Sequence, residues 1–140
     1  MAYALVFGFL LPMVVRMNEV LGRTIGQLPS SVGVHVIGGI FGACLILPFQ
    51  GRAWIDALPK VPWWAFLGGV IGTGLVVLAN RAVGALGVAS FTAVNIAAQL
   101  VTSGVMDHFG LFGSESFPMS LPRIAGMALL CVGAVLVVRG

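Results

Sequence analysis

The chain has 140 residues, of which 59% are hydrophobic and 8% are charged, with a formal net charge of +3. A soluble domain has about 45–50% apolar and about 25% charged residues, so this composition excludes a soluble globular domain, a disordered segment and a nucleic-acid-binding protein. At this length the chain is expected to form one domain, residues 1–140, embedded in a lipid bilayer.

Five apolar runs are long enough to cross a membrane as helices, because a hydrocarbon core about 30 Å thick needs about 20 residues at about 1.5 Å each. Each run is apolar throughout and does not alternate with period two, which favours helices over a β-barrel. We therefore predict an all-α integral membrane protein with five transmembrane helices. The predicted spans are residues 3–22, 30–49, 63–84, 88–108 and 120–138.

The first span carries an unusual concentration of charge. Arg16, Glu19 and Arg23 share one helical face with Pro12, whereas Asn18 points about 100° away from Glu19. Intramembrane charge indicates function, so we take Arg16, Glu19 and Asn18 as candidate substrate-binding residues. In this hypothesis Glu19 exchanges a coupling proton and Arg16 holds an anionic or polar group. Arg16 and Glu19 can pair with each other at i, i+3. The alternative to a direct function is that the long Arg16 side chain reaches the membrane surface by snorkelling. The run lacks a basic n-region and a cleavage site, so we interpret it as a mature span and not a signal peptide.

The connections and span ends contain residues typical of helix ends. Ser30 and Ser31 offer hydroxyls expected to cap the second helix, in which His35 is interpreted as a packing residue. Asn80 and Arg81, near the end of the third span, are interpreted as an interfacial anchor.

The fourth span has a polar face, formed by Thr92, Asn95, Gln99, Thr102 and Ser103. At about 100° per residue these side chains occupy a stripe about 100° wide. An unpartnered amide in hydrocarbon costs about 2–7 kcal/mol, so the stripe needs partners or water. We interpret it as the wall of a substrate cavity, with Asn95 and Gln99 near its middle. The alternative is hydrogen bonding between helices.

Asp107 and His108, at the end of this span, are expected to cap the helix.

The basic residues in the loops and near the span ends are balanced between the two sides of the membrane when Arg16, inside the first span, is left out; including it would tip the count by one. Arg52, Lys60 and Arg123 lie on the N-terminal side, and Arg23, Arg81 and Arg139 lie on the other. Such residues normally fix which face is cytoplasmic, so equal numbers predict insertion in both orientations. Two oppositely oriented copies would give an inverted-repeat, ten-helix bundle, and we expect an antiparallel homodimer. The alternative is that one charge or the lipid imposes a single orientation.

Several sequence motifs resemble those of one family. They are Pro62-Trp63-Trp64, then Gly68-Gly69-x-x-Gly72, and then Gln99-x-x-x-Ser103-x-x-x-Asp107-His108-Phe109-Gly110. They resemble the YdcZ family, small bacterial inner-membrane proteins grouped with the drug/metabolite transporter superfamily, and the likeness covers nearly the whole chain. The resemblance implies five helices, transport activity, a multi-pass inner-membrane location, and dual topology or paired antiparallel subunits.

No enzyme signature is present in the sequence: there is no nucleophile elbow, P-loop, dinucleotide fingerprint or metal-ligand spacing. We therefore expect no catalytic residues, cofactor or metal. The predicted function is secondary transport of a small solute by alternating access, driven by a proton or solute gradient. The expected partners are the lipid bilayer, a second copy of the chain, an unidentified small molecule and a coupling proton, with no nucleic acid. The alternatives are a non-transporting scaffold or accessory subunit with the same fold, or a passive channel.

Overall fold

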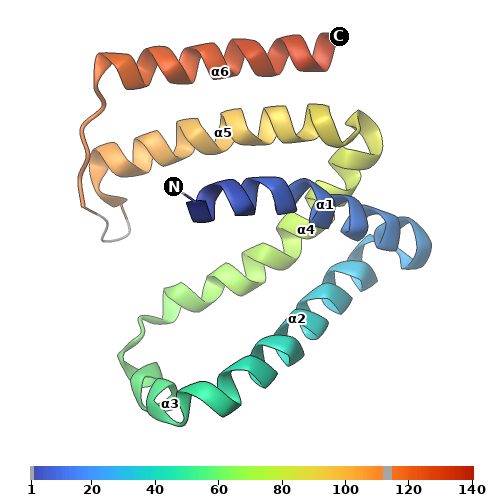
Figure 1. Ribbon diagram of the computed structural model, residues 1–140, viewed down its shortest axis with the longest axis vertical. Coiled ribbons are helices and arrows are strands. Elements are labelled where there is room, and N and C mark those ends of the chain that lie inside the picture. The colour runs from blue at the N-terminus through green and yellow to red at the C-terminus, as the bar shows by residue number, and fades with distance from the viewer. Residues whose placement is uncertain (1, 112–114) are drawn as a thin grey trace. The chain divides into compact units, whose positions relative to one another are not determined.

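The computed structural model describes residues 2–111 and 115–140, except for the side chains of residues 47, 50 and 53. The described residues form helices and contain no strand (Figure 1). The elements are α1 (Ala2–Ile25), α2 (Gln27–Gln50), α3 (Ala53–Ala57), η1 (Leu58–Lys60), η2 (Trp63–Phe66), α4 (Leu67–Leu86), α5 (Val88–Phe109) and α6 (Leu121–Arg139).

Five stretches are long and apolar enough to cross a membrane: Ala2–Ile25, Gln27–Ile46, Trp63–Leu86, Val88–Phe109 and Leu121–Arg139. They coincide with the five apolar runs of the sequence, so the prediction of an all-helical chain with five spanning helices is confirmed.

The chain divides into two compact units, Met1–Gly84 and Ala85–Gly140. In the first unit α1 packs against α2. Two side-chain hydrogen bonds join α2 to α4: Ser31 Oγ donates to the Thr73 carbonyl at 2.7 Å, and Asn80 Nδ2 donates to Ser30 Oγ at 3.3 Å. In the second unit α5 and α6 lie side by side (Figure 1).

Single glycines make two of the turns between helices. Only Gly26 separates α1 from α2, with φ of 96°, and only Gly87 separates α4 from α5, with φ of 79°. Because glycine adopts positive φ without a steric penalty, one residue is enough to end one helix and begin the next.

The early start of α2 overturns the prediction that Ser30 and Ser31 cap this helix. Gly26 holds the N-cap position, and α2 begins at Gln27, three residues before the predicted span. Ser30 Oγ instead donates to the Gln27 carbonyl at 2.8 Å. The prediction was wrong because the turn at Gly26 places both serines inside the helix, where their hydroxyls bond to carbonyls and not to free N–H groups.

The side chains of Asp107 and His108 hold the connection from α5 to α6 and do not cap α5 as predicted, because Gly110 takes the C-cap position and its N–H bonds to the Met106 carbonyl. Asp107 Oδ2 accepts from Arg123 Nη2 at 2.9 Å, and the Asp107 carbonyl accepts from the Phe117 N–H at 2.8 Å. His108 Nδ1 accepts from the Met119 N–H at 3.2 Å. These contacts tie the beginning of α6 back to the end of α5.

At Gly104, helix α5 is in close contact with α6. It is buried, and a Cβ at this position would lie 3.0 Å from Met127 Cε and 3.3 Å from its sulfur. The two helices therefore pack through a residue without a side chain, as is common between membrane helices.

We expect Gly104→Leu to destabilise the second unit by about 1–3 kcal/mol, the usual cost of overpacking. The measurement is the free energy of unfolding in detergent. The matched control is Gly133→Leu, because a Cβ at Gly133 has no neighbouring atom within 4 Å. Equal stability of the two variants would contradict this packing.

Candidate functional site

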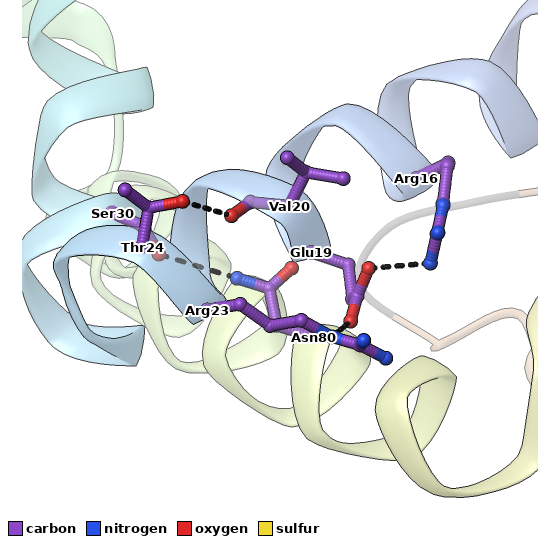
Figure 2. A network of polar contacts seen from close by, with 7 residues as sticks. All are labelled: Arg16, Glu19, Val20, Arg23, Thr24, Ser30 and Asn80. Atoms are coloured by element: carbon purple, nitrogen blue, oxygen red, sulfur yellow. Dashed lines mark hydrogen bonds and ion pairs between the residues drawn. The ribbon is translucent and has the colours of Figure 1, made fainter.

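A buried carboxylate between two arginines dominates the polar chemistry of α1. Glu19 is 0% exposed. Its Oε2 accepts from Arg16 Nη1 at 2.7 Å, and its Oε1 forms an ion pair with Arg23 Nε (Figure 2). The pairing of Arg16 with Glu19 was predicted from the i, i+3 spacing and is confirmed. The structure adds Arg23 at i+4 from Glu19.

The charged cluster of Arg16, Glu19 and Arg23 is buried at its centre and open at its edges. The side chains of Arg16 and Arg23 are 54% and 60% exposed, whereas that of Glu19 is fully enclosed. Helix α4 covers the carboxylate: a Cβ at Gly84 would lie 3.7 Å from Glu19 Oε1. The cluster therefore has a net charge of +1, with guanidinium groups that reach the surroundings of the helix.

Two side-chain amides, those of Asn80 and Gln27, lie next to the charged cluster. Asn80 is 1% exposed and donates from Nδ2 to Ser30 Oγ (Figure 2). Gly22 makes room for it, because a Cβ there would lie 2.9 Å from Asn80 Nδ2 and 2.5 Å from Gln27 Oε1. The interpretation of Asn80 as an interfacial anchor is therefore wrong. An amide inside a helix bundle is stabilised by a partner on another helix, and Ser30 supplies it.

Two acceptor oxygens of this amide group are left free. Asn80 Oδ1 and Gln27 Oε1 are buried and accept no hydrogen bond from any residue that the structure describes. A buried acceptor without a partner costs about 1–3 kcal/mol, so the site favours a hydrogen-bond donor there. The first unit thus combines guanidinium donors with unoccupied carbonyl acceptors, a set suited to a polar ligand or ordered water.

The middle of the polar stripe on α5, at Asn95 and Gln99, is turned away from α6, whereas Thr102 and Ser103 at its edges line grooves between α5 and α6. Ala97 and Gly104 are the buried positions of α5, and Gly104 faces α6. At about 100° per residue, Asn95 and Gln99 point about 160° away from Ala97 on either side. Asn95 is half-buried and Gln99 is exposed, and neither side chain makes a hydrogen bond within the part of the chain that the structure describes.

The other predicted binding residues differ in burial and in whether they have a hydrogen-bond partner. Thr92 is half-buried and Ser103 is exposed, and neither hydroxyl has a partner among residues 2–111 and 115–140. Thr102 Oγ1 donates to the Ala98 carbonyl at 3.0 Å, so its hydroxyl is satisfied within α5. Asn18 is half-buried on α1, away from the charged cluster. The structure thus brings Arg16 and Glu19 into contact and lines up the α5 residues on one helix.

Sequence reasoning missed Asn80, Gln27 and Gly22 as members of the site. Ser30 and Asn80 are 50 residues apart, so no helical spacing relates them. The available signal was an amide inside an apolar run, which in hydrocarbon requires a partner. Among the described residues, no group of three or more His, Cys, Asp or Glu is placed to hold a metal ion.

Five apolar spanning helices with polar groups gathered inside them define a multi-pass, all-helical membrane protein. Residues 1–136 match the sequence profile of a family described as "Putative inner membrane exporter, YdcZ". The chain belongs to this family and is a multi-pass protein of the inner membrane, which confirms the resemblance found in the sequence. The family description fits a transporter. No curated protein and no solved structure matches the chain.

We expect Glu19→Gln to destabilise the first unit by about 1–3 kcal/mol, because it leaves two guanidinium groups without their carboxylate. Their exposure keeps the loss below that of a fully buried pair. The triple variant Arg16→Leu/Glu19→Leu/Arg23→Leu should recover stability, since apolar residues replace the whole ionic group. Thermal unfolding in detergent measures the stability of both variants against the wild type. A Glu19→Gln variant as stable as wild type would show that the cluster contributes nothing to the fold.

Proposed function

We propose that this protein is a secondary exporter that moves a small solute across the inner membrane by alternating access, as an antiparallel homodimer. The family description supports export. The observation that carries the mechanism is the α5 face, on which Asn95 and Gln99 have no hydrogen-bond partner among the described residues. Unsatisfied amides on a spanning helix are costly unless water or solute reaches them, so this face is the proposed wall of the transport path.

The first unit supplies a second set of groups for this function. Arg16 and Arg23 present guanidinium donors to an anionic or polar part of the solute, and Glu19 holds both arginines in position. Glu19 is also the proposed site of the coupling proton. The charged groups that face it are Arg16 and Arg23, and α4 contributes Gly84, which carries no charge. Asn18 on α1, and Thr92 and Ser103 on α5, are further proposed contacts for solute. Thr102, predicted with them, already bonds to the Ala98 carbonyl and lies on the α6 side of its helix.

Open helix faces support the dimer. A Cβ at Gly38, Gly42 or Gly68 would meet no atom within 4 Å. Glycines spaced in this way let another helix approach closely in lipid. With five helices in each chain, a second copy in the opposite orientation would supply the other half of an inverted repeat. The basic residues near the ends of the spans divide three to three between the two sides when Arg16, inside the first span, is left out, and this supports such insertion.

Cysteine labelling tests the α5 face. In a Cys44→Ser/Cys131→Ser background, we expect Asn95→Cys and Gln99→Cys to react with water-borne thiol reagents in membranes. The matched controls are Val94→Cys and Val101→Cys, which lie on the opposite side of α5 and are 45% and 42% exposed in the protein alone. The controls should react slowly because lipid or protein covers them. Equal reactivity of both faces would remove the α5 stripe from the transport path.

The role of Asn95 and Gln99 in transport is tested by measuring solute flux into liposomes with an imposed pH gradient. We expect Gln99→Leu or Asn95→Leu to weaken solute binding about two- to tenfold each, the effect of losing one hydrogen bond, while the dimer persists. Solute flux that does not depend on the pH gradient would indicate a passive channel. Absence of flux for every solute tested would indicate a scaffold.

Orientation is tested by reporter fusions at the C-terminus, which should be active on both sides of the membrane. Two lysines added to the 109–119 connection should shift the population to one orientation, because basic residues are retained in the cytoplasm. A single orientation of the unmodified protein, with crosslinks only between parallel copies, would overturn the antiparallel dimer.

A further inference from the structure

A groove runs between α5 and α6 within the second unit. It has a volume of about 580 Å³ and is lined by Ala98 and Val101 from α5 and by Cys131 and Val135 from α6, with Arg139 at one end. The lining is almost wholly apolar: the hydroxyl of Thr102, also on the groove, is already bonded to the Ala98 carbonyl. The groove therefore suits a hydrocarbon chain.

The length of the groove matches one leaflet of a bilayer. Its lining extends from Val94 to Thr102 on α5 and from Cys131 to Arg139 on α6. Eight residue steps of helix correspond to about 12 Å. Half of a hydrocarbon core about 30 Å thick is about 15 Å. Since Arg139 is in the last turn of a spanning helix, the groove begins at the membrane surface and ends near the bilayer centre.

Arg139 gives the surface end of the groove a positive charge with no counterion. Its side chain makes no hydrogen bond or ion pair with any residue that the structure describes, and it is exposed. A guanidinium group binds phosphate oxygens through paired N–H donors. The groove thus offers apolar space for an acyl chain and, at the depth of the lipid headgroups, a donor for a phosphate.

We propose that the α5–α6 groove is a binding site for an anionic phospholipid, with one acyl chain between the helices and the headgroup phosphate on Arg139. A zwitterionic lipid also carries a phosphate, but its ammonium group offsets the attraction to Arg139. The site therefore prefers a lipid with a net negative charge. This proposal concerns the second unit alone and does not depend on the transport function.

Lipid retention tests the role of Arg139. The full-length protein is equilibrated with vesicles of phosphatidylethanolamine containing a minor fraction of phosphatidylglycerol. Lipids that remain bound in mild detergent are then counted by native mass spectrometry. Arg139→Gln should lower the ratio of bound phosphatidylglycerol to phosphatidylethanolamine about fivefold, the contribution of one basic residue near an anionic membrane surface. Arg139→Lys should retain most of the preference. Arg81→Gln, which removes an exposed arginine from another spanning helix, should leave the ratio unchanged.

A second pair of variants tests the groove itself. Ala98→Phe fills it from an exposed position and should abolish retention of the preferred lipid. Ala125→Phe adds the same bulk at an exposed site on α6 outside the groove lining and should not. Circular dichroism confirms that each variant folds. An unchanged lipid ratio in Arg139→Gln, or equal retention in the two phenylalanine variants, would overturn the proposal. Loss of a crosslinked dimer in Ala98→Phe alone would show that a second copy covers the groove, and would also overturn it.

Discussion

The constraint behind this structure is that hydrocarbon offers no hydrogen bonds, so each polar group in a spanning helix needs a partner within the protein. Helix formation satisfies the backbone, and a few side-chain contacts satisfy the rest. Glu19 can be fully buried because Arg16 and Arg23 both reach it. Asn80 can be buried because Ser30 accepts its amide hydrogen, and these same contacts bring α1, α2 and α4 together at one end.

Missing side chains make these contacts possible. Gly22 leaves space for the amide of Asn80, and Gly104 leaves space for Met127 between α5 and α6. Gly26 serves a different purpose, since its positive φ reverses the chain in one residue. These glycines therefore serve two separate purposes, close packing between helices and compact turns.

Polar side chains that have a hydrogen-bond partner in the protein are explained by the fold, whereas those without one are the residues proposed to bind a ligand. Asp107 and Arg123 bond to each other, and His108 bonds to the chain after α5, which explains their presence without a ligand. Asn95 and Gln99 have no such explanation among the described residues, and Arg139 has none at the surface end of its groove. Water, a solute, a lipid or a second copy of the chain can supply the missing partners.

The sequence by itself determined the number and position of the spanning helices, the Arg16–Glu19 pair and the family, because length, apolar runs and i, i+3 spacing are local properties of the chain. It failed for Ser30, Ser31 and Asn80. The direction of a serine hydroxyl depended on the turn at Gly26, and the burial of Asn80 depended on a contact with Ser30 across 50 residues. Only the tertiary structure decided these, because helical periodicity states which residues share a face and not which helix that face meets.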